Sequence, residues 1–320
     1  INVKQSIKMV LLLYRFLPKL HSIKYVLKDK YLSRSIYCHN IFRNKEKEKE
    51  YENFVKNLDV YKGGDVNLHF YNDDGIAVIT FDNPSSKNAF TGSMMLKFRS
   101  IVKELHNWEQ GKCIILQGAN KQFCSGGDLK SFVRHMETPQ HGYLMSKFMQ
   151  SLTSEFSKLP FISVSLVQGN ALGGGAEILT STDFRVMQQS AVIGFVQTRL
   201  SITTGFGGTT RLVNIIGKKN ALRLLMSGCL VTAEEAIQIG LADKIVCDDK
   251  DALESCIKWL LNEQNLAKID SQLLQNLKMS VMYAASNSYE ESYEFERKIF
   301  KKFWMGKMHL NALDKNLKHK

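Results

Sequence analysis

Runs of apolar residues predict a chain that switches repeatedly between short strands and amphipathic helices. Residues 67–71 and 76–81 are β-like runs separated by Asn-Asp-Asp-Gly, a turn sequence typical of a hairpin. Residues 94–108 carry apolar side chains at helical spacing, so one face of that helix should pack. Residues 113–116 (Cys-Ile-Ile-Leu) are a buried type of strand.

A second round of the same pattern follows. Residues 142–158 have a helical apolar face, Pro160 ends that helix, and 161–167 form the next apolar strand. Another helix is predicted over 173–182 and another strand over 184–187. The alternation of apolar strands with helices predicts an α/β fold built from stacked ββα units.

From about residue 251 the pattern becomes almost continuously helical. We expect helices over 251–262, 267–285 and 289–303, with aromatic and Met side chains that pack against the core or a partner subunit. The interpretation divides the chain into a basic leader (1–50), a core (51–260) and a C-terminal helical region (261–320).

The distribution of charge argues against nucleic-acid binding. The net charge is +12, but residues 1–50 hold 12 Lys/Arg against 4 Asp/Glu, and the remaining 270 residues hold 31 against 27. The body is therefore close to balanced, whereas a nucleic-acid interface needs a basic stripe on the fold. The sequence contains no run of eighteen uncharged apolar residues, so no membrane-spanning helix is predicted.

The leader is read as disordered or as a targeting segment. Its first 28 residues contain no acidic residue and resemble a mitochondrial presequence, although Arg is sparse. The sequence begins with Ile, so Met9 is a candidate start. Cytosolic and mitochondrial locations both stay open.

The six cysteines do not predict a metal site. They lack CxxC pairs and metal-like His spacing, and we expect reduced, mostly buried thiols. They are Cys38, Cys113, Cys124, Cys229, Cys247 and Cys256.

Two glycine-rich turns carry the chemistry. Residues 123–129 read Phe-Cys-Ser-Gly-Gly-Asp-Leu and follow the first buried strand, and residues 168–177 read Gln-Gly-Asn-Ala-Leu-Gly-Gly-Gly-Ala-Glu and follow the next. Glycine lets the backbone approach a ligand, and free N–H groups at a helix start favour negative charge. Two such N–H groups on one oxygen would form an oxyanion hole.

The pair of turns resembles the crotonase, or enoyl-CoA hydratase, superfamily, whose loops read F-x-[AS]-G-x-D-[LI] and A-L-G-G-G-x-E. The resemblance implies a crotonase-type spiral of stacked ββα units and a coenzyme A thioester as substrate. It assigns the oxyanion N–H groups to Gly127 and Gly174. It assigns substrate and coenzyme A contacts to a loop after the hairpin and to other residues of the two turns. These residues are Lys87, Asn88 and Ala89 in the loop, Ser125, Gly126, Asp128 and Leu129 in the first turn, and Gly173 in the second.

The reaction depends on which acids accompany the glycines. A hydratase of this superfamily uses paired glutamates to move protons. The first is present as Glu177, but Gln197 stands where the second is expected, and an amide cannot exchange a proton at neutral pH. The alternative is a purely structural role, in which the Glu177 carboxylate accepts hydrogen bonds from backbone N–H groups.

The finer resemblance is to superfamily decarboxylases that act on ethylmalonyl-CoA. It extends over most of 51–320, although His is expected at the position of Gln197 and an Ile-Pro at Thr203-Thr204. Loss of CO₂ from a malonyl-type thioester leaves an enolate, which two N–H donors stabilise. Glu177 is then the candidate proton donor, Gln197 a candidate partner of the substrate carboxylate, and Ile193, Phe195, Val196 and Phe206 the candidate apolar walls.

These resemblances imply a catalyst without a metal or organic cofactor that works as a homotrimer or hexamer, with C-terminal helices at the interface. An enoyl-CoA hydratase-like enzyme and a coenzyme A-binding protein without catalysis remain alternatives. Methylmalonyl-CoA is a second candidate substrate.

Overall fold

A computed structural model describes residues 45–314, which fall in two compact units divided in the sequence between Phe54 and Val55. The described part of the first unit, residues 45–54, is helical. Most of the predicted leader, Cys38 and the last six residues lie outside the described residues. In the described residues, no helix is long and apolar enough to cross a membrane.

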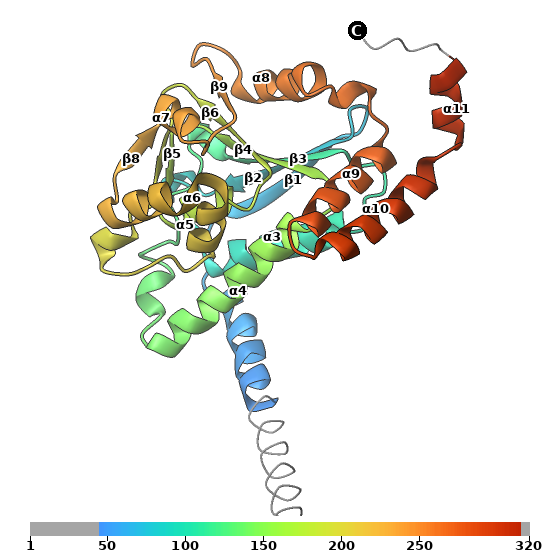
Figure 1. Ribbon diagram of the computed structural model, residues 1–320. Helices are drawn as coiled ribbons and strands as arrows, with labels where there is room; N and C mark the ends of the chain where they lie inside the picture. The colour runs from blue at the N-terminus through green and yellow to red at the C-terminus, as the bar shows by residue number, and fades with distance from the viewer. Residues whose placement is uncertain (1–44, 315–320) are drawn as a thin grey trace, which may run out of the picture. The chain divides into compact units, whose positions relative to one another are not determined.

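The second unit is built on a six-stranded sheet in the order β1-β2-β3-β4-β6-β9 (Figure 1). β1 and β2 form the predicted antiparallel hairpin, and the other neighbouring strands are parallel. The first five strands were predicted from sequence, and β9 was not. The strands are β1 (Asp65–Tyr71), β2 (Ile76–Asp82), β3 (Cys113–Gly118), β4 (Ile162–Val167), β6 (Phe184–Gln188) and β9 (Lys244–Val246).

A second sheet holds three short strands in the order β5-β7-β8: β5 (Asn170–Leu172), β7 (Val192–Gly194) and β8 (Leu230–Thr232). Only two residues separate β4 from β5, so the chain changes sheet in one tight turn. Gly169 in that turn has φ +57°, and a Cβ there would lie 2.6 Å from the Lys121 carbonyl oxygen. Glycine is therefore required at this corner. Three-residue strands are too short for a period-2 pattern to predict.

The helices match most of the predicted amphipathic segments. Thr91 and Thr138 cap α3 and α4 by accepting a hydrogen bond from an amide of the first turn, and Ser288 caps α10 in a capping box. The helices are α3 (Gly92–Leu105), α4 (Pro139–Ser157), α5 (Gly174–Leu179), α6 (Gly208–Ser227), α7 (Ala233–Gln238), α8 (Ala252–Lys258), α9 (Ser271–Ala284), α10 (Tyr289–Phe303) and α11 (Lys307–Asp314).

The two faces of the large sheet are covered by different parts of the chain. On one face, Phe81 of β2 contacts Phe98 of α3 at a centroid distance of 5.6 Å. On the other face, Ile76 and Val78 of the same strand belong to a cluster with Trp259 and other side chains from α8, α9 and the turns between them. The alternation of side chains along β2 therefore serves both layers.

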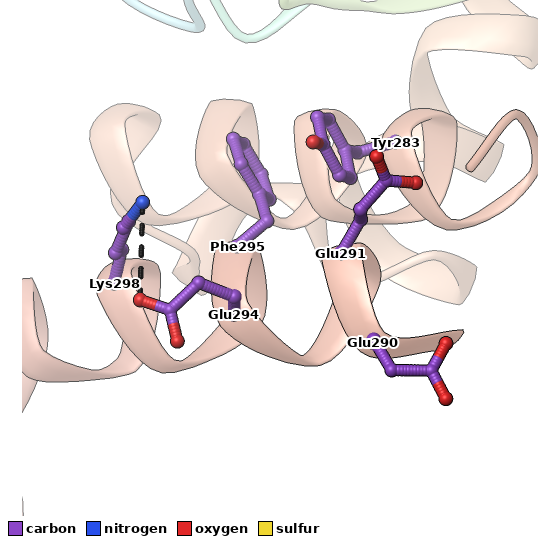
Figure 2. A pocket seen from close by; sticks show the side chains of 6 residues that line it. All are labelled: Tyr283, Glu290, Glu291, Glu294, Phe295 and Lys298. Atoms are coloured by element: carbon purple, nitrogen blue, oxygen red, sulfur yellow. Dashed lines mark ion pairs between the residues drawn. The ribbon is translucent and has the colours of Figure 1, made fainter. Parts of the chain in front are cut away.

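The last two helices are attached to the body mainly through α9. Tyr283 of α9 and Phe295 of α10 stack with ring centroids 4.3 Å apart and planes 6° apart. Glu291, Glu294 and Lys298 line a hollow at this stack together with Glu290, whose carboxylate points away from the two rings (Figure 2). Within residues 289–314, no side chain of α10 or α11 is buried.

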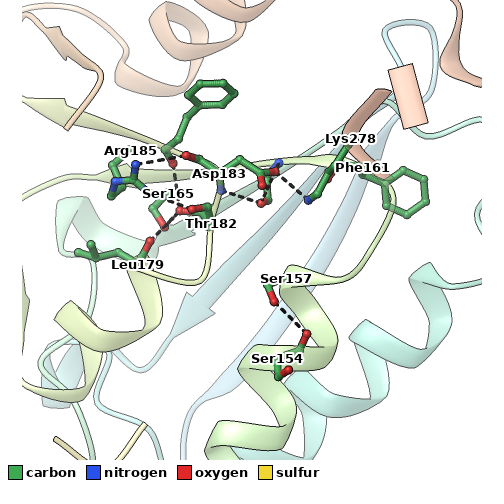
Figure 3. Close-up of polar contacts among 11 residues, drawn as sticks. Ser154, Ser157, Phe161, Ser165, Leu179, Thr182, Asp183, Arg185 and Lys278 are labelled. Carbon is green, nitrogen blue, oxygen red and sulfur yellow. Dashed lines mark hydrogen bonds and ion pairs between the residues drawn. The ribbon is translucent and has the colours of Figure 1, made fainter. Parts of the chain in front are cut away.

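A buried ion pair ties α9 to the sheet. The Lys278 ammonium lies 2.7 Å from Asp183 Oδ2 and donates to the Phe161 carbonyl at 2.6 Å (Figure 3). The same Asp183 oxygen accepts from the Ser163 amide and hydroxyl at 2.7 and 2.8 Å. Lys278, only 5% exposed, thus has a carboxylate and a carbonyl as acceptors for its ammonium. Burial of a charge is tolerated only with such partners.

We expect Lys278→Met to lower the free energy of unfolding by about 2 kcal/mol, because Asp183 and the Phe161 carbonyl would lose their buried partner. Urea unfolding at neutral pH measures the change. Lys258→Met is the matched control, since Lys258 and Glu254 form an exposed ion pair, and it should shift stability by less than about 0.5 kcal/mol. Equal effects in the two variants would contradict an anchoring role for Lys278.

Candidate active site

The structure brings the two predicted glycine turns together. Cys124 and Ala171 form an isolated parallel bridge, in which the Cys124 amide donates to Asn170 at 3.1 Å and the Leu172 amide donates to Cys124 at 2.9 Å. A Cβ placed on Gly126 would lie 3.0 Å from the Gly174 nitrogen. The two turns are therefore in direct backbone contact, as their places at the carboxyl ends of neighbouring parallel strands require.

One amide in each turn is left without a protein acceptor. The first turn pairs with Phe90, whose amide donates to Gly126 O at 2.7 Å and whose carbonyl accepts from Asp128 N at 2.8 Å. Between these two bonds, the Gly127 N–H has no acceptor among the described residues. Gly174 is the first residue of α5, and amides of a first helical turn have no intrahelical acceptor. Both predicted N–H donors are available to a ligand oxygen.

The second turn tolerates no side chain where it meets its neighbours. A Cβ on Gly174 would lie 2.6 Å from the Phe206 ring, and a Cβ on Gly175 would lie 2.1 Å from the Cys124 carbonyl oxygen. Gly173 has φ +53° and donates its amide to Gly194 of β7 at 2.8 Å. Packing thus opposes a side chain at Gly174 and Gly175, whereas Gly173 is favoured by its positive φ.

The loop predicted to contact coenzyme A lies beside the first turn. The Lys87 carbonyl accepts from the Ser125 amide at 3.0 Å, and Ser125 Oγ donates to Ser86 O at 3.0 Å. Asn88 and Ala89 are buried, and the Asn88 side chain is used within the protein, donating to Gln122 O at 2.6 Å. Of the three predicted loop residues, only Lys87 is exposed.

Asp128 and Leu129 complete the first turn in different ways. Burial favours a raised pKa for Asp128, but hydrogen bonds dominated by the Ser131 amide outweigh it and lower the pKa. Asp128 Oδ1 accepts from the Ser131 and Lys130 amides at 2.8 and 3.0 Å, which closes the turn. Leu129 is 47% exposed beside it. Asp128 holds the backbone, and Leu129 is accessible to a ligand.

Glu177 is buried and accepts four hydrogen bonds. Its Oε1 accepts from Gln197 Nε2 at 2.8 Å and from the Gly205 amide at 3.1 Å. Its Oε2 accepts from the Phe206 and Gly208 amides at 2.6 and 2.9 Å. The carboxylate therefore joins α5 to the start of α6.

Burial raises the pKa of Glu177, and the hydrogen bonds from Gly208, Gly205, Phe206 and Gln197 offset only part of that effect. Arg211 of α6 is the neighbouring cation: its Nη2 donates to the Glu177 carbonyl at 3.0 Å and to Phe206 O at 2.7 Å. A carboxyl with a raised pKa can hold a proton in a range where an exposed glutamate cannot.

Sequence reasoning missed the source of these donors. We did not predict from the sequence pattern that the segment Gly205–Gly208 holds the first acid. The signal was present, because a glycine-rich helix start is a ready-made carboxylate site. The structural interpretation of Glu177, a carboxylate that accepts from backbone N–H groups, agrees with these contacts, although it did not name the amides that donate.

The other predicted site residues lie at the second turn or in the core behind it. Gln197 is 7% exposed and pairs with Glu177. Phe206 lies against Gly174, and Val196 Cγ2 is 4.0 Å from the position of a Cβ on Gly173. Ile193 and Phe195 are fully buried. Apolar side chains thus surround the second turn.

The cysteine in the first turn is a packing residue. Cys124 is fully buried, and burial raises the pKa of its thiol to about 12. Its sulfur also accepts from the Gly126 amide at 3.4 Å. A thiol that stays protonated at neutral pH is not a nucleophile.

Known proteins resemble this chain over most of its length. The enoyl-CoA hydratase/isomerase family model matches residues 71–314. A mouse protein named ethylmalonyl-CoA decarboxylase is 40% identical over 270 residues, covering 84% of this chain and 82% of its own length. A protein of the same name from Xenopus tropicalis is 38% identical over 287 residues, covering 89% of this chain and 92% of its own.

Solved structures of enoyl-CoA hydratases show the same fold. The Bacillus anthracis enzyme superposes with a TM-score of 0.70 at 23% identity, covering 78% of this chain and 94% of its own. The Mycobacterium smegmatis enzyme superposes with a TM-score of 0.71 at 19% identity, covering 78% of this chain and 94% of its own. The crotonase-type fold predicted from the two glycine motifs is confirmed, and the chain belongs to the enoyl-CoA hydratase/isomerase family.

Proposed function

We propose that this protein is a carboxy-lyase that converts ethylmalonyl-CoA to butyryl-CoA, with methylmalonyl-CoA as a second substrate. One observation carries the proposal: Gly127 and Gly174, in two touching backbone turns, each offer an N–H without an acceptor in residues 45–314. The relatives named ethylmalonyl-CoA decarboxylase, which the chain matches over most of their length, supply the substrate class.

The chemistry follows from what the two amides can stabilise. The bond between the α-carbon and the substrate carboxylate breaks, its electron pair enters the thioester as an enolate, and CO₂ leaves. The Gly127 and Gly174 N–H groups hold the enolate oxygen. The loss of one such donor typically reduces turnover by ~10²–10³. No general base is needed for this step, and the reaction we propose uses no metal or organic cofactor.

The α-carbon of the enolate then takes a proton, for which Glu177 is our candidate donor. Its raised pKa supports this role, because the proton must be present when CO₂ leaves. The four hydrogen bonds to its carboxylate support the competing structural role. In our proposal Gln197 contacts the substrate carboxylate, and Phe206 and Val196 contribute apolar walls.

Coenzyme A would enter along the loop that contains Lys87, beside the first glycine turn. Lys87 is exposed and can meet a phosphate, while Asn88, Ala89, Ser125, Gly126 and Asp128 shape the backbone there. Leu129 and Gly173 lie at the two turns themselves. We assign these residues to substrate and coenzyme A binding.

Purified full-length protein incubated with a panel of acyl-CoA thioesters tests the activity. We expect CO₂ release and butyryl-CoA from ethylmalonyl-CoA, detected by mass spectrometry. Water addition to crotonyl-CoA without any decarboxylation would instead identify a hydratase that works with one carboxylate. Binding of the thioesters without turnover would identify a coenzyme A-binding protein, and binding to nucleic acid in a shift assay would indicate another class.

Gly174→Pro should reduce turnover of ethylmalonyl-CoA by ~10²-fold or more, because proline has no N–H to donate. Gly174→Ala is the matched control, since it adds a Cβ against Phe206 but keeps the N–H. We expect alanine to cost less turnover than proline when both variants show native circular dichroism. Equal losses would assign the effect to the Phe206 contact and would contradict the donor role.

We also propose a homotrimer or hexamer assembled through the C-terminal helices. Val281, Tyr289, Tyr293, Phe300 and Trp304 are each between 55% and 78% exposed, on helices that would otherwise leave this apolar area in water. Light scattering should give three or six times the 36.5 kDa chain mass. Tyr293→Glu with Phe300→Glu should shift the mass toward a monomer, whereas Lys47→Glu in the leader should not.

The physiological setting we propose is the clearance of carboxylated by-products of fatty-acid metabolism, a metabolite-repair role in the cytosol. The mitochondrial matrix is the alternative suggested by the basic leader. Fractionation of cells that express the full chain with a C-terminal tag distinguishes the two compartments.

A further inference from the structure

The Glu177–Gln197 pair has one unmet hydrogen bond. Gln197 Nε2 donates to Glu177 Oε1 at 2.8 Å, and Gln197 is 7% exposed. Its Oε1 is buried and has no hydrogen-bond partner among the described residues. A buried acceptor without a donor is unfavourable, so this edge of the amide is suited to a group that the protein itself does not supply.

Glu177 can gain a proton only if one of its donors moves. A carboxylate has about four lone-pair directions, and here each oxygen already accepts two hydrogen bonds. Three of the four donors are backbone amides of Gly205, Phe206 and Gly208, which are fixed by the start of α6. The fourth is the Gln197 amide, which can rotate about its terminal torsion.

Rotation of that amide exchanges its two polar atoms. Once Glu177 Oε1 carries a proton, it becomes a donor, and the Gln197 Oε1 atom can turn to accept from it. Nε2 then occupies the edge that Oε1 held. The unused edge of Gln197 is therefore an acceptor while Glu177 is ionised and a donor while Glu177 is protonated.

The pair lies beside the second glycine turn. Val196, the residue before Gln197, lies near Gly173, and the Phe206 amide bonds Glu177 while the Phe206 ring lies against Gly174. Among the elements packed on α5, the charged side chain beside Glu177 is Arg211 of α6. β5 has no titratable side chain, and Arg199, on the 3-10 turn that begins at Gln197, donates to the Gly228 carbonyl at 2.8 Å.

We infer that Gln197 is a positioning residue that links the substrate carboxylate to the protonation of Glu177. The inference rests on the proposed function, because it needs a carboxylated acyl-CoA. A substrate carboxylate at the edge that Gln197 Oε1 now occupies requires a donor there, and that edge carries a donor only when Glu177 is protonated and the amide has rotated. Binding of the substrate therefore takes up one proton from solvent and stores it on Glu177.

The stored proton balances the reaction. When CO₂ leaves, the Glu177 O–H bond breaks and the α-carbon C–H bond forms, so that the enolate is neutralised and Glu177 returns to its carboxylate. Gln197 then rotates back. The net change is one carboxylated thioester plus one proton giving one acyl thioester plus CO₂.

Titration calorimetry of the full-length protein in two buffers of different ionisation enthalpy counts the protons taken up. The carboxylated probe is the thioether analogue of ethylmalonyl-CoA, which lacks the thioester carbonyl and cannot form the enolate. The uncarboxylated probe is butyryl-CoA. We expect uptake of close to one proton per site with the carboxylated probe and close to none with butyryl-CoA. The affinity for the carboxylated probe should then fall about tenfold per pH unit above the pKa of Glu177 in the ligand-free protein.

Gln197→Met keeps the length of the side chain and removes both amide atoms. We expect it to bind butyryl-CoA like the parent protein and to lose the proton uptake with the carboxylated probe. Glu177→Gln should lose the uptake as well. The inference is overturned if the parent protein binds the carboxylated probe without proton uptake, fails to bind it, or if Gln197→Met retains the uptake.

These outcomes separate the inference from the proposed activity. Release of CO₂ from ethylmalonyl-CoA without proton uptake on binding would leave the activity intact and remove the linkage. Proton uptake with no CO₂ release would preserve the linkage and contradict the carboxy-lyase.

Discussion

Backbone contact between Gly126 and Gly174 is the constraint on which the site depends. β3 and β4 are parallel neighbours, so the turns that follow them leave the sheet at the same edge. The turns pair at Cys124 and Ala171, and their closest approach, at Gly175, requires glycine because a Cβ there would lie 2.1 Å from the Cys124 carbonyl oxygen. This contact places the start of α5 against the first turn and leaves one amide in each turn without an acceptor in the described part of the chain.

The Glu177 carboxylate extends that arrangement to α6. Its four donors come from two segments twenty or more residues further along the chain, so a single buried side chain holds three parts of the site in register. The burial that lets the Glu177 carboxylate join these segments also raises its pKa. Structural and proton-handling roles of Glu177 thus share one physical cause, and Gln197 is the only one of its donors free to rotate.

The C-terminal helices differ from the core in how much of their surface is buried. α9 is held to the sheet by Lys278, whose ammonium is buried and paired with Asp183, and by apolar side chains such as Leu274. α10 and α11 extend from it with aromatic side chains in water, among them Tyr289 at 78% exposure. A buried charge of this kind needs an oppositely charged partner and hydrogen bonds, whereas an exposed aromatic surface suits a partner chain.

The sequence by itself determined the family, most of the large sheet and the positions of Gly127, Gly174 and Glu177, because apolar periodicity and glycine spacing are local properties of the chain. It did not predict β5, β7 and β8, since strands of three residues carry no readable period and form only through their neighbours. Nor did it predict that Gly205, Phe206 and Gly208 hold Glu177, or that Gln197 keeps an unpaired oxygen. Those features depend on which segments meet in space, and only tertiary packing decides whether a buried polar atom finds a partner.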